Sequence, residues 1–315
     1  MKEIGGYIEL DKYELPMLHE GNIALNCGRN ALAYIIRARN IKKILLPKFL
    51  CDSVADVCKK ENVNIRYYSI GTDFLPQDLC VEEDEYLYFV NYYGQINNAI
   101  IMQYCVDNRI IVDNAQAYFQ EPISGIDTIY TCRKFFGVSD GAFLYTKCKN
   151  TIEYEVDESF ERIRFLLGRF ERTASEFYCE YASNNKMFAN EPVKYMSKLT
   201  ANLLHGIDYK KVEEVRMNNF LNLNSELKYY NRLKLNIPRG AFMYPLYIKD
   251  AEPIRKELQK KKIFIPTLWP DVFNICNESE IEYDMAKNIL PIPVDQRYNE
   301  TDMKYVLIQL KELLS

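Results

Sequence analysis

Two side chains that could do chemistry together lie at the ends of neighbouring apolar runs in this chain. The run RIIVD (109–113) ends in Asp113, and the run DTIYT (127–131) is followed three residues later by Lys134. Short runs of this kind, rich in β-branched residues, predict buried strands. An amine can form a Schiff base with pyridoxal 5'-phosphate, and a carboxylate can keep the ring nitrogen of that cofactor protonated. The pair therefore predicts a pyridoxal phosphate site.

Each member of the pair also has an ordinary explanation. Lys134 could be a surface lysine in a loop, although it precedes the Asp140-Gly141 turn and follows a strand, which places it at a sheet edge where clefts form. Asp113 could cap a helix beginning in NAQAY. A carboxylate at the end of a buried strand is costly unless it has a partner, so the two residues together favour the cofactor.

Other residues near strand ends could orient the ring. Gln116 lies three residues after Asp113, and a helical turn there would place both side chains on one face, with Gln116 near the phenolic oxygen of the cofactor. Asn91 follows the apolar run YLYFV, and Phe49 follows the run ILLP. Phe49 is a candidate to stack on the pyridine ring.

A phosphate site is predicted at the start of the helix that follows LNC. Gly28, Arg29 and Asn30 would present backbone N–H groups and a guanidinium to an anion. Thr131, close to Lys134, could add a hydroxyl group to the same phosphate. The alternatives are an ordinary helix start and an ordinary β-branched strand residue.

Strand-like and helix-like patterns alternate in the first half of the chain. The predicted strands cover 42–47, 63–70, 86–93, 109–115, 127–131 and 142–146, and the predicted helices cover 29–40, 50–61 and 98–107. This order predicts an α/β fold with a mostly parallel central sheet flanked by helices. Ligands of such sheets bind at the carboxyl ends of the strands, where the candidate residues fall.

The second half predicts two long amphipathic stretches and then a smaller α+β unit. The stretches cover 157–182 and 197–233; the unit has strands at 242–248 and 263–268 and helices at 251–262 and 301–314, the last capped by Thr301. We predict a large cofactor-binding domain over 15–205 and a small C-terminal α+β domain over 206–315 that includes 1–14.

Composition excludes several classes of function. The net charge is −4 and no basic stripe stands out, which argues against nucleic acid as a partner. The nine cysteines form no CxxC pair and only two histidines are present, so we expect no metal site and reduced thiols in a cytoplasmic protein. No uncharged stretch approaches the roughly 20 apolar residues of a membrane span.

Several segments match, in order, the motifs of one known family. LNCGRNAL (25–32) resembles Ser-Gly-Thr-x-Ala-Leu, FVNYYGQ (89–95) resembles Val-His-Leu-Tyr-Gly-Gln, and IIVDNAQAY resembles Ile-Glu-Asp-Ala-Ala-Gln-Ala-His. TCRKFFGVSDGAFLYT resembles a lysine segment followed by Gly-Asp-Gly-Gly. The chain thus resembles the DegT/DnrJ/StrS family of pyridoxal-phosphate-dependent sugar aminotransferases, which have the type I aspartate-aminotransferase fold.

The resemblance implies a homodimer that transfers an amino group, typically from glutamate, to a keto group on a nucleotide-linked sugar. The product would feed a polysaccharide or a glycosylated metabolite. By the same resemblance Lys134 is the Schiff-base lysine, Asp113 and Gln116 contact the cofactor ring, and Asn91 stands at the family's histidine. Dehydratases of the family carry histidine in place of the lysine, so Lys134 argues against that activity. A nucleotide-binding domain would need a G-x-G-x-x-G or P-loop motif, which is missing.

The chain also departs from the family. Arg29 stands at the family's threonine, and Cys51 rather than Phe49 aligns with its ring-stacking aromatic residue. Val193 and Tyr195 replace the Asn-x-Arg that reaches a neighbouring subunit's cofactor. One hypothesis is that Arg29 replaces that lost anchor. These departures keep open a non-catalytic or regulatory descendant of the fold, or a sugar-modifying enzyme of another reaction type.

Overall fold

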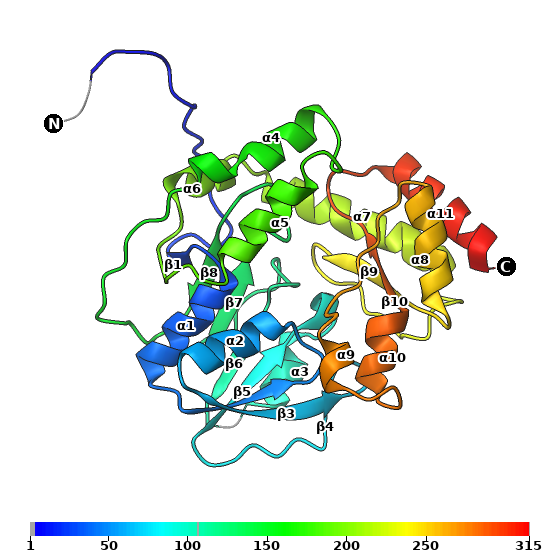
Figure 1. Cartoon of the computed structure of the whole chain (residues 1–315), viewed down its shortest axis with the longest axis horizontal. Coiled ribbons are helices and arrows are strands. Elements are labelled where there is room, and N and C mark those ends of the chain that lie inside the picture. The colour runs from blue at the N-terminus through cyan, green and yellow to red at the C-terminus, as the bar shows by residue number, and fades with distance from the viewer. Residues whose placement is uncertain (1–3, 106, 315) are drawn as a thin grey trace.

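The computed structural model describes residues 4–105 and 107–314 and centres on an eight-stranded sheet (Figure 1). Its strands lie in the order β1 (Ile23–Leu25), β8 (Ala142–Tyr145), β7 (Asp127–Thr131), β6 (Ile110–Asp113), β5 (Glu85–Val90), β2 (Lys43–Pro47), β3 (Asn64–Ile70) and β4 (Pro76–Gln77). The five strands from β7 to β3 run parallel, and β1, β8 and β4 pair antiparallel. The mostly parallel sheet is confirmed; β1 and β4 were not predicted.

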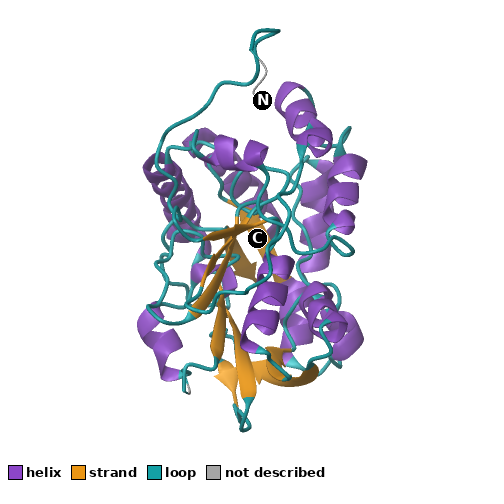
Figure 2. Cartoon of the chain, turned by 90° about the vertical axis from the view of Figure 1, so that its left-hand side faces the viewer, coloured by secondary structure: helices purple, strands orange, loops and turns teal. Residues whose placement is uncertain are grey.

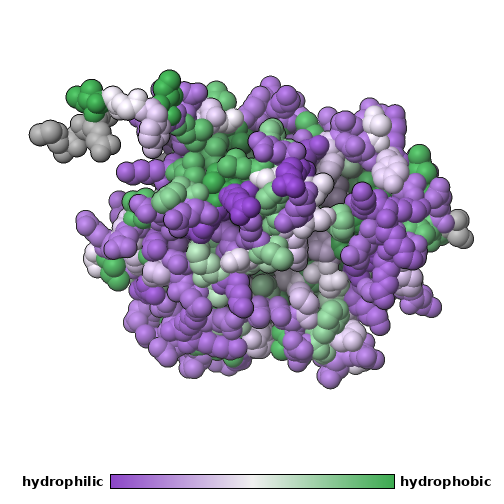
Figure 3. Space-filling model, turned by 45° about the horizontal axis from the view of Figure 1, so that its top comes forward, coloured by the Kyte–Doolittle hydropathy of each residue, from purple (hydrophilic) through white to green (hydrophobic). Residues whose placement is uncertain are grey.

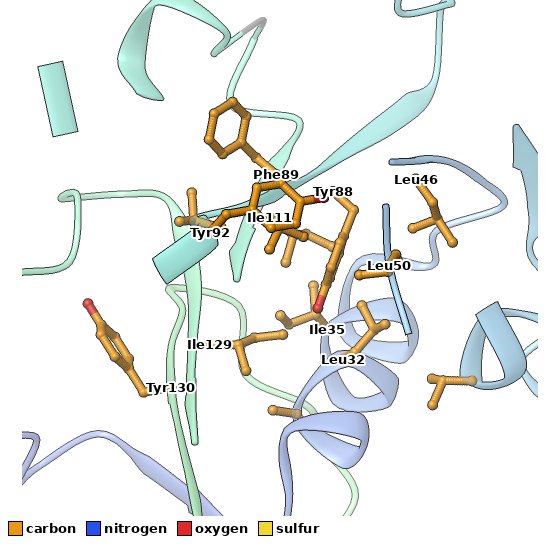
Figure 4. Close-up of a cluster of buried hydrophobic side chains, with 14 of the residues drawn as sticks. Leu32, Ile35, Leu46, Leu50, Tyr88, Phe89, Tyr92, Ile111, Ile129 and Tyr130 are labelled. Carbon is orange, nitrogen blue, oxygen red and sulfur yellow. The ribbon is translucent and has the colours of Figure 1, made fainter. Parts of the chain in front are cut away.

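Helices cover both faces of this sheet (Figure 2). They include α1 (Gly28–Arg39), α2 (Asp52–Lys60) and α3 (Asn98–Gln103), close to the predicted ranges, and β5 is followed by the 3-10 turn η1 (Tyr92–Gly94). Leu32 and Ile35 of α1 face Tyr88 and Ile129 of the sheet (Figure 4), and all four side chains are almost fully buried. The apolar face of α1 therefore fixes where this helix begins relative to the ends of the central strands.

The two long stretches predicted after residue 157 are each divided. The first contains η2 (Phe160–Arg162), α4 (Arg164–Glu171) and α5 (Tyr178–Met187), and the second contains α6 (Lys198–Leu204) and α7 (Tyr209–Leu227). Arg172 leaves the helical region with φ −135° and ψ −133°. Asp208 caps α7 by accepting a hydrogen bond from the Lys211 N–H at 3.0 Å. Local turn chemistry therefore overrides the amphipathic pattern at both breaks.

The C-terminal part builds a second, two-stranded antiparallel sheet from β9 (Met243–Tyr247) and β10 (Ile289–Pro293). Its helices are α8 (Ala251–Lys260), α9 (Val272–Ile275), α10 (Ile281–Asn288) and α11 (Glu300–Leu314). Residues of α7, α8, α11 and both strands form a separate apolar core. The strand predicted at 263–268 is wrong, because that segment has no strand pairing, and β10, which contains two prolines, was missed.

Two further expectations concern the ends of the chain. Asn299 rather than Thr301 caps α11: its side chain accepts the N–H of Thr301 at 2.9 Å and that of Asp302 at 3.1 Å. Of the segment predicted to join the small domain, residues 1–3 lie outside the described residues. Asp11 and Tyr13 hydrogen-bond Asn202 of α6, within the predicted large domain.

No helix in the described part of the chain is long and apolar enough to cross a membrane.

His19 is buried in an aromatic cluster beneath β8. Its Nε2–H donates to the carbonyl oxygen of Tyr118 at 2.9 Å, so its Nδ1 can accept from the hydroxyl of Tyr145 at 3.1 Å. The ring also lies 4.1 Å from that of Tyr130. Burial lowers the pKa of His19 from 6.5 to about 4. The fold therefore holds this imidazole neutral.

Acidification should consequently destabilise the protein through His19. Between pH 6.5 and 4 the unfolded chain binds a proton at this side chain that the folded chain does not, so stability falls as pH falls through this window, by about 3 kcal/mol in total. Urea unfolding of the wild type and of His19→Gln at pH 7.5 and 4.5 checks this. From pH 7.5 to pH 4.5 the free energy of unfolding should fall more for the wild type than for His19→Gln. An equal fall in both proteins would contradict the prediction.

Candidate active site

A cavity of about 1910 Å³ opens at the carboxyl ends of the central parallel strands. Its wall includes residues that follow β6 and β7, the first turn of α1 and residues of the C-terminal part such as Phe242 and Trp269. Both Asp113 and Lys134 line it. The two residues on which the sequence argument depends therefore share one cavity.

Lys134 follows β7 in a tight turn. Phe135 donates its N–H to the carbonyl oxygen of Cys132 at 2.9 Å, and the Lys134 Nζ lies 5.6 Å from the centre of the Phe242 ring. The residue is exposed, and it lines the cavity. Loss of hydration lowers the pKa of Lys134, and the charge of Asp113 opposes that shift. A lysine of this kind is easier to deprotonate than a surface lysine.

Asp113 is held by two donors. Its Oδ1 accepts the N–H of Ala115 and its Oδ2 accepts the hydroxyl of Tyr88, both at 2.8 Å. Burial raises the pKa of Tyr88, and the Asp113 charge raises it further, so Tyr88 remains a donor. No α-helix begins after Asp113, where the chain forms a turn. The N-cap interpretation does not apply, and lone pairs remain for a ligand.

Gln116 comes from the same turn and lines the same cavity. Its Oε1 accepts the backbone N–H of Tyr93 at 2.7 Å, which supports a residue with the unusual φ of +53°. The amide nitrogen has no hydrogen-bond partner among the described residues. Gln116 thus has a fixed orientation and two N–H donors that a ligand could use.

The predicted phosphate end lies where α1 meets β7. A Cβ atom at Gly28 would lie only 2.7 Å from the Cγ2 atom of Thr131, so only glycine lets the helix approach this strand. The first turn of α1 contains no acidic residue, and Cys27 provides no side-chain cap. Gly28, Arg29 and Thr131 all line the cavity. The helix N-terminus is therefore open to an anion.

Three predicted residues do not line the cavity. Asn30 donates to the Asn26 side chain at 2.9 Å and to the Pro192 carbonyl at 2.7 Å. Asn91 is fully buried, and its Oδ1 accepts the N–H of Ile96 at 3.0 Å. Both side chains therefore form hydrogen bonds within the protein and hold the segments behind the cavity wall.

Phe49 is the third residue outside the wall. It has no exposed surface, and its ring packs 4.5 Å from that of Trp269. Cys51, two residues later, lines the cavity instead. The chain turns after β2, so that the side chain of Phe49 points into the core and packs against Trp269, which lines the cavity.

The loop that carries Lys134 is also held from the C-terminal part. The carbonyl oxygen of Phe135 accepts hydrogen bonds from Arg216 of α7 at 3.1 Å and from Gln296 at 2.7 Å. Arg216 is almost fully buried, and its guanidinium lies 4.6 Å from the Phe135 ring. These contacts fix the backbone next to Lys134.

The cavity is also lined by three residues that were not predicted from the sequence, Tyr88, Trp269 and Arg133. The alternation in β5 offered a signal for Tyr88, because β5 pairs Val90 with Asp113 and so places Tyr88 on the same face of the sheet. No local pattern indicates Trp269, since it reaches the cavity from the distant C-terminal part.

Comparison with known proteins gives the fold. CalS13 from Micromonospora echinospora, a sugar aminotransferase, superposes with a TM-score of 0.64 at 16% identity over 93% of this chain and 88% of its own. A DegT DnrJ EryC1 StrS aminotransferase from Brucella abortus superposes with a TM-score of 0.65 at 13% identity over 93% and 86% of the two chains.

NtdA from Bacillus subtilis, with its bound cofactor PMP, superposes with a TM-score of 0.65 at 12% identity over 93% of this chain and 73% of its own. The chain has the fold of these proteins. No protein-family model and no curated protein sequence matches it. The type I fold expected from the sequence is therefore confirmed, and it places Asp113 at the carboxyl end of β6 and Lys134 just after β7.

Proposed function

We propose that this protein is a pyridoxal-phosphate-dependent aminotransferase that moves an amino group from an amino acid such as glutamate to a keto sugar. The observation that carries the proposal is the cavity that Lys134 and Asp113 share, in which the Asp113 charge acts on the Lys134 amine. The solved structures with the same fold, sugar aminotransferases among them, support it.

The residues of the cavity fit the cofactor. Asp113 has carboxylate lone pairs left beside its bonds to Tyr88 and Ala115, as a protonated ring nitrogen requires. Gln116 has free amide N–H groups for the phenolic oxygen, and the uncapped start of α1 suits the phosphate. When bound, pyridoxal phosphate supplies an electron-withdrawing ring that stabilises negative charge on the carbon beside the transferred nitrogen.

Each of these residues has one task in the proposed mechanism. Lys134 would hold the cofactor through its Nζ and, as a neutral amine, would move the proton at the substrate carbon. The lowered pKa of Lys134 suits both tasks, because only the neutral amine has a lone pair with which to bond the cofactor or accept a proton. Asp113 keeps the ring nitrogen protonated, and Tyr88 orients the Asp113 carboxylate. Gln116 stabilises charge on the phenolic oxygen.

The charge of the cavity supports a nucleotide-linked sugar as the acceptor. Among the described residues, nine lysines and arginines line the cavity against three aspartates, whereas the whole chain carries a net charge of −4. A cleft of one sign raises the local concentration of a ligand of the opposite sign. The diphosphate of a nucleotide sugar provides such a charge, and we infer a role in polysaccharide or glycoside biosynthesis.

An exposed apolar surface that forms part of the cavity lining supports a homodimer. Leu167 and Phe170 of α4 and Tyr178 of α5 are 58%, 93% and 64% exposed. Apolar side chains gather on this face of the molecule (Figure 3). Exposed apolar groups on this scale are typical of protein interfaces.

We place the protein in the cytoplasm, since all nine cysteines are free.

The experiment uses the purified protein with pyridoxal phosphate. We expect a visible absorption band that moves when glutamate is added and returns when a keto-sugar nucleotide is supplied. A panel of keto-sugar nucleotides then identifies the acceptor. A protein that takes up no cofactor would sink the enzyme assignment and favour the non-catalytic descendant.

A further inference from the structure

Arg133, the residue before Lys134, is a cation without an acidic partner. Its guanidinium donates a hydrogen bond to Asn185 Oδ1 and lies 4.9 Å from the ring centre of Phe188. Among the described residues no carboxylate lies within ion-pair distance of it. Asp140, which attracts it from farther away, is already bound by the backbone and side chain of Ser197. Arg133 lines the cavity.

A second unpaired cation lies close to it. Arg29 also lines the cavity, at the first turn of α1, and has no ion pair among the described residues. Burial lowers the pKa of Arg133, and the charge of Arg29 acts in the same direction. Two repelling guanidinium groups beside an uncapped helix N-terminus are unfavourable unless an anion joins them.

We propose that Arg133 and Arg29 together bind the phosphate group of the cofactor, so that one chain holds it without an arginine from a second copy. This inference rests on the proposed function. Guanidinium groups are the side chains best suited to phosphate, because their donors match two of its oxygens at once. Thr131 also lines the cavity, next to Gly28, and its hydroxyl makes only a long contact of 3.5 Å to the Ala115 carbonyl oxygen, so it can donate to the same group.

The segment that could otherwise reach a second copy is engaged within its own chain. Val193 is buried, and Tyr195 donates its N–H to the carbonyl oxygen of Glu155 at 2.8 Å. The Tyr195 ring lies 6.0 Å from that of Tyr154. The cation between these two residues, Lys194, is paired with Glu191 at 2.8 Å. This segment therefore has no unpaired cation for a neighbouring site, which leaves Arg29 and Arg133 to balance the phosphate charge.

The test compares pyridoxal phosphate with pyridoxal, which lacks the phosphate. Trp269 is the single tryptophan of the chain and lines the cavity, so its fluorescence reports binding of either compound. In Arg133→Met and in Arg29→Met we expect the preference for pyridoxal phosphate over pyridoxal to fall roughly 10- to 100-fold. Pyridoxal affinity should stay unchanged, which also shows that the cavity is intact.

Arg164→Met is the matched control, because Arg164 is exposed, pairs with Glu180 and lies outside the cavity wall. It should keep the wild-type preference. If Arg133→Met does not fold, Arg133→Lys keeps a cation over Phe188 but loses the two-point contact, and its preference should fall severalfold. An unchanged preference in Arg133→Met, or in Arg133→Lys where only that variant folds, overturns the proposal.

Two further outcomes separate this proposal from the proposed function. A wild type that binds pyridoxal and its phosphate equally well, yet still responds to glutamate, overturns the phosphate assignment and leaves the aminotransferase standing. Affinity for pyridoxal phosphate should not change when the protein is diluted. A loss of affinity on dilution would mean that a second copy completes the site and would overturn the single-chain anchor.

Discussion

Lys134→Ala should lose amine transfer by at least about 10³-fold while remaining folded. The side chain is exposed, lines the cavity and makes no hydrogen bond to another described residue, so its removal should cost little stability. Its chemistry has no substitute, because Arg133, the adjacent cation, cannot give up a proton at neutral pH. Turnover with glutamate and a keto-sugar nucleotide measures the loss.

Borohydride reduction and peptide mapping give an independent readout. The label from reduced cofactor should fall on the wild-type peptide that contains Lys134 and be missing from the variant. Lys147→Ala, which removes an exposed lysine after β8, is the control and should keep both label and turnover. Label on another lysine in the wild type would show that the catalytic amine has been misassigned.

Asp113→Asn should lower turnover by roughly 10²- to 10⁴-fold with little change in the fold. The amide oxygen can still accept the N–H of Ala115, and the amide NH2 group can donate to the hydroxyl oxygen of Tyr88, so the local geometry is retained. It cannot, however, favour the protonated form of a pyridine nitrogen, since it carries no charge. The turnover number should therefore fall much more than the affinity for the cofactor.

Asp107→Asn is the matched control, because Asp107 lies before β6 and its side chain is 81% exposed. It removes one negative charge from the same part of the chain and should behave as wild type. Tyr88→Phe should have a smaller effect, since it removes one donor and leaves the carboxylate. Equal turnover in Asp113→Asn and wild type would mean that this carboxylate does not face the ring.

The sequence was a good guide wherever local pattern decides structure. The parallel strands are short apolar runs, and their carboxyl ends bring Asp113, Gln116 and Lys134 into one wall. Gly28 was singled out as a helix start, and the close approach of Thr131 explains why glycine stands there. These inferences needed only the period of a strand, the end of a strand and the start of a helix, and these are patterns of neighbouring residues in the sequence.

The remaining features depend on contacts between distant segments. Phe49 was expected in the cavity, but its direction is set by Trp269, 220 positions later in the chain. Asn30 was expected at the phosphate, but Asn26 and Pro192 bind its side chain. A residue type alone does not tell whether a polar group is satisfied by the protein or left for a ligand.

The grip of Arg216 and Gln296 on the Phe135 carbonyl has a mechanical consequence. The peptide unit next to Lys134 is hydrogen-bonded to helix α7 and to the segment after β10, in addition to its connection to β7. If the C-terminal part tilts relative to the large sheet, the loop that carries Lys134 should therefore move with it. We therefore expect that substitutions in the contact between α7 and α11, far from the cavity, change the catalytic rate more than they change thermal stability.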